Sequence, residues 1–222
     1  EKIRGVTYTG SARVGKIVAQ EADKYLKKTV MELGGSDAYI ILKDADIDAA
    51  VKTCVEGRVN NAGQTCVAAK RFIIEEDVYD AFKDKYVAAM KDVTYGDPMD
   101  RGSDMGPLST FDLRDRVHNQ VQDTVKKGAE CLCGGEMPDG EGAFYPATVL
   151  ANIPQGTPAY EDEIFGPVAS LFKVKDAQAA IDLANDHRYG LGGGIFSQDT
   201  EKAIDIACNQ LDTGMVNIFF FF

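Results

Sequence analysis

The chain has no tryptophan, only two histidines and five cysteines among its 222 residues. Basic residues are also few: 24 Lys and Arg against 35 Asp and Glu give a formal net charge of -11 at pH 7. This negative charge would repel a phosphate backbone, so nucleic-acid binding is not expected. No run approaches the roughly 18 apolar residues of a membrane span, so no membrane association is expected.

The remaining composition is that of a protein able to bury a core. Hydrophobic residues make up 45% and charged residues 27%, and the length allows one large domain or one domain plus part of another. The first residue is Glu1 rather than Met, and no signal-like segment follows it. We therefore expect a piece of a longer protein.

The five cysteines show neither pairing nor metal-site spacing, and no metal is expected. Cys131 and Cys133 form an isolated CxC that reads as two side chains on one face of a strand. Unpaired cysteines in an acidic chain favour a reducing, cytoplasmic location. His118 falls in a helical pattern and His187 in a loop, and both are interpreted as structural.

Strand and helix patterns alternate along most of the chain. Compact apolar runs predict strands at 38–42, 71–74, 130–133, 148–150, 168–174, 193–196 and 215–218. Helical periodicity predicts helices at about 78–90, 110–127, 177–185 and 200–211. It also predicts a helix that Asp44 or Asp46 caps and that runs to about residue 59. This order predicts an α/β fold, a parallel sheet with helices on both faces.

The first thirty residues form a separate unit. Val6–Thr9 is a strand candidate, and the turn from Gly10 through Ser11 to Gly15 leads into a helix reaching about residue 26. Backbone N–H groups and a hydroxyl at such a turn can hold a phosphate at the helix N-terminus. The pattern differs from the GxGxxG fingerprint, and a plain turn remains an alternative.

Cys66 in Gly-Gln-Thr-Cys and Glu32 in Glu-Leu-Gly-Gly carry the most specific chemical signal. A cysteine among small residues can be approached by a substrate, and a glutamate before two glycines can activate a water. Because histidines are few, a carboxylate is the expected base for Cys66. Together they predict a covalent thio-intermediate that an activated water hydrolyses.

With these motifs the chain resembles the aldehyde dehydrogenase superfamily over about residues 4–218. The motifs are Tyr8-Thr9-Gly10-Ser11 with Val14-Gly15, Glu32-Leu33-Gly34-Gly35, Gly63-Gln64-Thr65-Cys66 and Glu163-Ile164-Phe165-Gly166-Pro167-Val168. Within the family, the resemblance is greatest to bacterial NAD(P)-dependent succinate-semialdehyde dehydrogenases, through residues 66–73 and 111–115.

The resemblance implies oxidation of an aldehyde, such as succinate semialdehyde, to a carboxylic acid with NAD or NADP. Cys66 would form a thiohemiacetal and then a thioester, and its N–H would supply half of the oxyanion hole. Glu32 would activate the hydrolytic water. Gly10, Ser11, Gly15, Leu33, Glu163 and Phe165 would bind the cofactor, with Glu163 on the nicotinamide ribose and Phe165 beside the ring.

The resemblance also implies a three-layer αβα parallel-sheet catalytic domain at 34–218, preceded at 1–33 by the end of a Rossmann-like cofactor domain. Segment 219–222, four phenylalanines, departs from the family pattern and is set apart as an anomalous tail. By itself this piece would bind cofactor poorly and would be inactive, and the full-length protein would be a homo-oligomer, a dimer or tetramer. Where some succinate-semialdehyde enzymes have an arginine, Asn60 stands here, with Arg58 two residues earlier.

Two alternatives remain beside a dehydrogenase for another class of aldehyde. One is a cysteine acyltransferase or thioesterase that pairs Cys66 with His118 or His187. The other is a non-catalytic, truncated module, although Cys66 and Glu32 are both in place.

Overall fold

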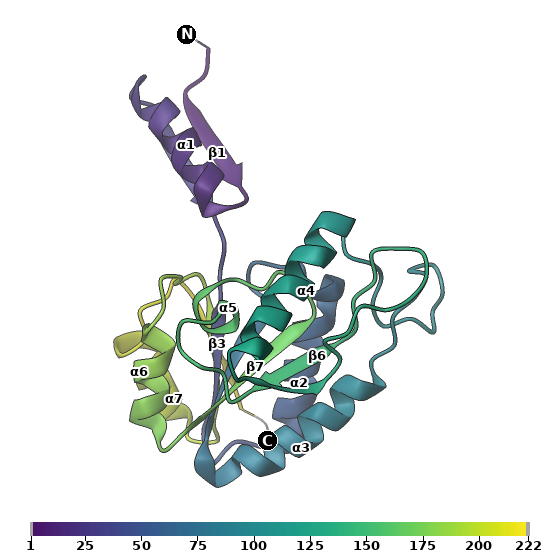
Figure 1. The fold of residues 1–222 in the computed structure, drawn as a ribbon. Helices are drawn as coiled ribbons and strands as arrows, with labels where there is room; N and C mark the ends of the chain where they lie inside the picture. The colour runs from purple at the N-terminus through teal and green to yellow at the C-terminus, as the bar shows by residue number, and fades with distance from the viewer. Residues whose placement is uncertain (1, 221–222) are drawn as a thin grey trace. The chain divides into compact units, whose positions relative to one another are not determined.

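The computed structural model describes residues 2–220, and the chain divides into two compact units, 1–35 and 36–222. The first unit contains β1 (Gly5–Thr9), α1 (Ala12–Asp23) and β2 (Lys28–Glu32), drawn in purple in Figure 1. The strands β1 and β2 pair in parallel, with Thr9 opposite Glu32. The unit is therefore one βαβ element.

The sequence predicted β1 and α1 of this unit but not β2. Helix α1 ends at Asp23, earlier than expected, and a turn with Leu26 in the left-handed region (φ 50°) leads into β2. Strand β2 was not predicted, because it has a single partner strand and all but one of its residues are exposed. Such a strand lacks the buried alternation that makes strands visible in a sequence.

The second unit is built on one seven-stranded sheet in the order β5-β6-β7-β4-β3-β8-β9. Its strands are β3 (Asp37–Ile41), β4 (Ala69–Glu75), β5 (Glu130–Cys133), β6 (Thr148–Ala151), β7 (Val168–Val174), β8 (Gly193–Phe196) and β9 (Val216–Phe219). All neighbours pair in parallel except the edge strand β5, which runs antiparallel to β6.

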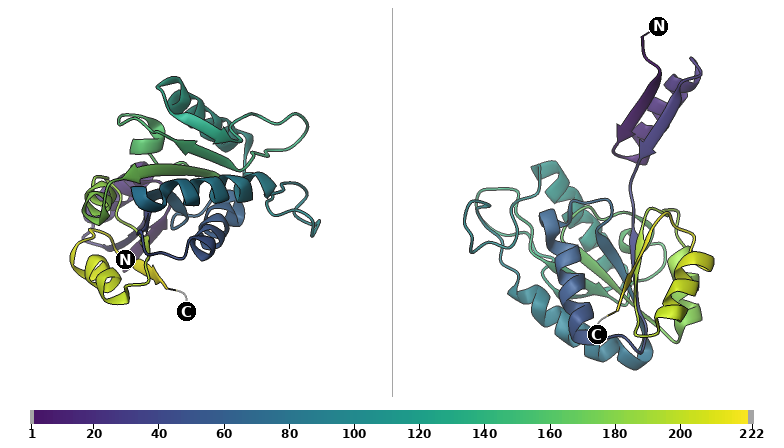
Figure 2. Two further views of the ribbon diagram at one scale, coloured as in Figure 1. Left: turned by 90° about the horizontal axis from the view of Figure 1, so that it is seen from below. Right: turned by 180° about the vertical axis from the view of Figure 1, so that it is seen from behind.

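Helices cover both faces of this sheet. They are α2 (Ile47–Val59), α3 (Glu76–Asp92), α4 (Phe111–Lys126), α5 (Pro158–Glu161), α6 (Ala177–Asn185) and α7 (Thr200–Asn209). Figure 1 shows α4 in front of the sheet with α2 and α3 behind it, and the rear view in Figure 2 brings α2 and α3 forward. The predicted αβα fold class is confirmed.

The core lies on the central strands. Every residue of β3 and β4 is buried, as expected of parallel strands covered on both faces. Chain connections run from β3 through α2 to β4 in one direction and from β7 through α6 to β8 in the other. Since parallel crossovers are right-handed, this reversal puts α2 and α6 on opposite faces.

Two details of this unit differ from the sequence expectation. The short helix α5 was not predicted, because four residues are too few for helical periodicity. Strand β9 includes Phe219, whose ring stacks on Phe196 with centroids 4.5 Å apart, so the sheet extends one residue into the segment set apart as a tail. Residues 221 and 222 of that segment lie outside the described residues. Within 2–220, no helix combines the length and apolar run needed to span a bilayer.

Candidate active site

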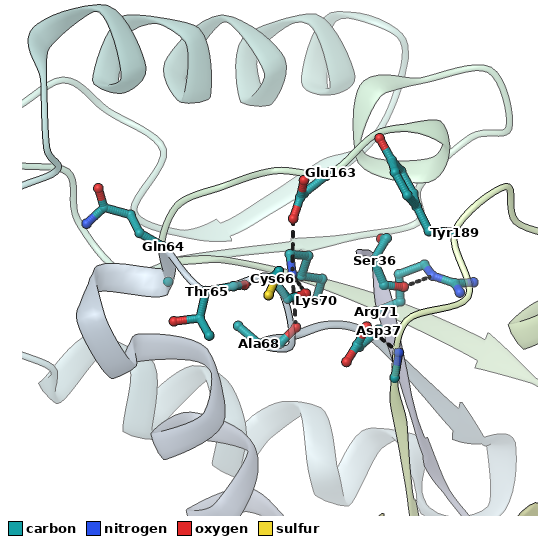
Figure 3. Close-up of polar contacts among 12 residues, drawn as sticks. Ser36, Asp37, Gln64, Thr65, Cys66, Ala68, Lys70, Arg71, Glu163 and Tyr189 are labelled. Carbon is teal, nitrogen blue, oxygen red and sulfur yellow. Dashed lines mark hydrogen bonds and ion pairs between the residues drawn. The ribbon is translucent and has the colours of Figure 1, made fainter. Parts of the chain in front are cut away.

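The predicted nucleophile Cys66 lies at the side of the sheet formed by the amino-terminal ends of the parallel strands. It is half-buried in the loop between the 3-10 turn η1 (Asn60–Gly63) and β4. Asp37 is the first residue of β3, Glu163 precedes β7, and Gly192 precedes β8. Because the amino ends of parallel strands share one edge, residues from distant parts of the sequence meet there (Figure 3).

A left-handed turn leads into the Cys66 loop. Asn61, Ala62 and Gly63 have φ values of 53°, 52° and 73°, a conformation that costs an ordinary residue about 1–2 kcal/mol. The turn is held by two reciprocal hydrogen bonds: Asn61 Nδ2 donates to the Gln64 carbonyl at 3.1 Å, and Gln64 Nε2 donates to the Asn61 carbonyl at 3.0 Å. Surrounding contacts therefore hold a strained backbone next to the cysteine.

Gly63 brings the nucleophile motif against the second predicted cofactor motif. A Cβ placed on Gly63 would lie 2.3 Å from the Gly166 carbonyl oxygen, so only glycine allows this approach. Cys66 and Glu163 belong to two segments that touch at this glycine pair.

Replacing Gly63 by alanine should lower the free energy of unfolding by at least about 2 kcal/mol, because the methyl group meets backbone and φ is positive. Thermal unfolding measures the change. Gly57→Ala is the matched control: Gly57 lies in α2, where a Cβ would make only ordinary contacts at 3.7 and 4.0 Å. That variant should gain about 0.5–1 kcal/mol. Equal effects of the two substitutions would contradict the packing argument.

Arg58 lies beneath the turn and is fully buried. Its Nη2 donates to the Gly63 carbonyl at 2.7 Å, and burial lowers the pKa of the guanidinium to about 10. With no exposed surface, this side chain supports the turn and does not present its charge to a substrate carboxylate.

Lys70 links the two motifs directly. Its Nζ donates to the carbonyls of Thr65 at 3.0 Å, Cys66 at 2.8 Å and Ala68 at 3.2 Å. The same nitrogen lies 3.7 Å from Oε1 of Glu163, an ion pair that Figure 3 marks with a dashed line. Burial, and secondarily Arg58, lower the Lys70 pKa to about 8, so the ammonium is retained at neutral pH.

Asp37 and Arg71 are buried beside this cluster but serve the fold. Asp37 accepts the Gly192 N–H at 3.1 Å, and burial raises its pKa to about 6. The guanidinium of Arg71 donates to the carbonyls of Ser36, Leu183 and Ala184 at 2.9–3.0 Å. These bonds fix the start of β3 against the end of α6.

Glu163 and Phe165 occupy the loop before β7. The Glu163 side chain retains 18% of its exposure, and the Glu163 carbonyl accepts Gln120 Nε2 at 3.3 Å. Phe165 is half-buried between buried neighbours. A partly exposed carboxylate and a partly exposed ring can contact a ligand.

The remaining predicted site residues lie in the first unit. The Gly10 N–H donates to the Glu32 carbonyl at 3.0 Å, which joins the turn after β1 to the end of β2. Ser11 caps α1 by accepting the Val14 N–H. Leu33 packs on the helix at Gly15, where a Cβ would lie 2.6 Å from its Cδ2. The Glu32 side chain is exposed at the end of β2.

Both histidines have structural partners. His187 donates from Nε2 to the Tyr160 carbonyl at 3.0 Å and accepts the Tyr189 N–H on Nδ1 at 3.3 Å. Burial lowers its pKa to about 4, so it stays neutral. Nδ1 of His118 lies 3.4 Å from the Tyr145 hydroxyl. This arrangement favours the structural interpretation over a Cys-His pair.

Sequence reasoning missed Lys70 and Arg58 as members of the site. Lys70 carried a usable signal, because a lysine followed by the buried run Phe72–Ile74 is rare unless its charge is paired. Arg58 was named only for its distance from Asn60; its support of the turn carried no signal, since the helical pattern around Arg58 says nothing about the turn beyond α2. Within the described part of the chain, no group of three or more His, Cys, Asp or Glu side chains could hold a metal ion.

The fold places the chain among αβα domains with a mainly parallel sheet, and its sequence narrows this class to one family. A profile of the aldehyde dehydrogenase family matches residues 1–220, and the chain belongs to this family. It is 48% identical over 217 residues to the succinate semialdehyde dehydrogenase [NAD(P)+] Sad of Escherichia coli K12, covering 98% of the chain and 47% of that protein.

Solved structures show the same similarity. Succinic semialdehyde dehydrogenase from Streptococcus pyogenes, in complex with NADP+, superposes with a TM-score of 0.95 at 44% identity, covering 98% of this chain and 48% of that one. Betaine aldehyde dehydrogenase from Staphylococcus aureus, in complex with NAD+, gives 0.94 at 32% identity, covering 99% and 44%. The chain thus spans about half the length of the relatives it matches.

Proposed function

We propose that the chain contributes the nucleophile of an NAD(P)-dependent aldehyde dehydrogenase that oxidises an aldehyde to a carboxylic acid. The observation that carries the proposal is the Cys66 loop, half-exposed, joined to the Glu163 segment by the Gly63–Gly166 contact and by Lys70. Family membership supports it. Since the relatives are about twice as long, we propose that the activity belongs to a longer protein of which this chain is part.

In this reaction the Cys66 thiolate adds to the aldehyde carbon, and loss of hydride leaves a thioester on the sulfur. Glu32 takes a proton from the water that hydrolyses the thioester to the acid. A backbone N–H of the kind that Cys66 offers to the substrate oxygen is typically worth about 10²–10³ in rate. The histidine-based acyltransferase and the non-catalytic module remain the competing readings.

The residues present suit a dinucleotide, which when bound accepts the hydride. The first turn of α1 contains no acidic residue, and Ser11 stands at its N-terminus, a combination that favours a phosphate. Gly10, Gly15 and Leu33 shape this turn, so we propose residues 1–33 as the end of a cofactor domain and 34–218 as the catalytic domain. Glu163 would accept hydrogen bonds from ribose hydroxyls, and Phe165 would pack beside the nicotinamide.

We propose a semialdehyde such as succinate semialdehyde as the substrate, on the strength of the named relatives. Arg58 is buried, so a second carboxylate would have to be recognised by another group. All five cysteines are free, which agrees with a reducing, cytoplasmic location. We also propose a homo-oligomer for the full-length enzyme.

The test is NAD(P)H formation by the complete protein against semialdehydes and simple aldehydes, with each cofactor. We expect turnover with at least one aldehyde and the highest kcat/KM with a semialdehyde. If folded protein forms no NAD(P)H with any aldehyde of the panel, the proposal is wrong. Preference for a simple aldehyde would overturn only the substrate class.

A further inference from the structure

The carbonyl groups of the Cys66 loop are directed at two buried cations. Lys70, 3% exposed, donates hydrogen bonds to the carbonyls of Thr65, Cys66 and Ala68. Arg58, fully buried, donates to the carbonyl of Gly63. Burying an ammonium is costly unless its donors are satisfied, and these three hydrogen bonds use all three donors of Lys70.

This arrangement fixes the direction of the loop's N–H groups. The peptide bonds of the loop are trans, and in a trans peptide the carbonyl and the following N–H point in opposite directions. The Thr65 carbonyl accepts from Lys70 at 3.0 Å and from the Ala68 N–H at 3.1 Å, so the Cys66 N–H points away from the buried ammonium. The Cys66 carbonyl orients the N–H of Val67 in the same way, and Val67 is 40% exposed.

We propose that Lys70 is a positioning residue that holds the Thr65–Cys66 peptide plane so that the Cys66 N–H donates to the oxygen of the reacting aldehyde. The inference rests on the proposed function and deepens it. As the sulfur–carbon bond forms, the C=O π pair moves onto oxygen and creates an alkoxide. A preorganised N–H stabilises that charge without further reorganisation of the loop.

The charge of Lys70 also makes the arrangement sensitive to pH. The charged or titratable groups that act on its ammonium are Arg58, Glu163, Asp37 and Cys66. As pH rises through about 8, Lys70 becomes an amine with two donors for three carbonyls. Hydride transfer should therefore decline as pH rises through about 8 and Lys70 loses its proton.

The experiment compares wild type with Lys70→Met in the complete protein, using single-turnover NAD(P)H formation with the best aldehyde of the panel. Lys70→Met keeps the length of the side chain and removes its donors. We expect hydride transfer to slow about 10²–10³-fold, with KM for the aldehyde changed only a few fold. Lys52→Met, at an exposed site on α2, is the matched control and should behave as wild type.

The pH profile separates positioning from mere packing and needs only the wild-type protein if Lys70→Met does not fold. Wild type should show a descending limb near pH 8, and folded Lys70→Met should lack it. Hydride transfer by folded Lys70→Met within about threefold of wild type, or a wild-type rate still rising at about pH 9, would overturn the inference. If Cys66→Ala still forms NAD(P)H, the proposed function itself is wrong. If Cys66→Ala is inactive but Lys70→Met behaves as wild type, the inference about Lys70 alone is wrong.

Discussion

Replacing Cys66 by alanine in the complete protein should lower NAD(P)H formation by at least about 10⁴-fold. Without the thiol, no carbon–sulfur bond forms, and the aldehyde carbon never becomes the tetrahedral centre that releases hydride. The backbone contacts of Lys70 to this loop go to carbonyls and survive the substitution, so the loop should keep its conformation. Absorbance of NAD(P)H under saturating aldehyde measures the effect.

Cys208→Ala is the matched control, because Cys208 is a free, exposed cysteine on α7. It should retain the wild-type rate. Mass spectrometry of a stalled wild-type reaction should locate an acyl adduct on Cys66. Residual activity above about 1% in Cys66→Ala, or an adduct on another cysteine, would contradict the nucleophilic role.

The sheet could be read from the sequence because its central strands carry an unambiguous signal. Residues 38–42 and 72–74 are continuous apolar runs, as strands covered on both faces must be. The order of strands and helices followed from such runs. Strand β2 escaped because its burial is slight, and α5 because a single turn has no period.

The candidate site residues could be chosen from the sequence, but the contacts that support them could not. Cys66 and Glu163 stood out by motif, yet their connection depends on contacts between distant parts of the sequence, such as Gly63 against Gly166. The small residues before Cys66 were interpreted as leaving it open to a substrate. The structure shows that they also permit close packing, within a turn held by Asn61, Gln64 and Arg58. Single contacts between distant segments produce no periodic pattern in the sequence, so they could not be predicted from it.

Replacing Glu32 by glutamine in the complete protein should preserve the first hydride transfer and slow the release of acid. Glutamine has the same shape but cannot take a proton from water, and a general base is worth about 10²–10⁴ in rate. The Gly10 N–H bonds to the Glu32 carbonyl, which the substitution leaves in place. We therefore expect a burst of one NAD(P)H per active site, a slow steady state and an acyl thioester accumulating on Cys66.

Rapid mixing followed by acid quench and mass spectrometry measures the burst and the thioester together. Glu21→Gln is the matched control, since Glu21 is an exposed acid on α1 in the same unit. Its side chain forms an exposed ion pair with Lys24. This variant should release acid at the wild-type rate. A loss of the burst in Glu32→Gln would place Glu32 before hydride transfer rather than after it. Without a general base the thioester on Cys66 is hydrolysed only slowly. Normal steady-state release of acid by Glu32→Gln would therefore mean that a group other than Glu32 activates the water.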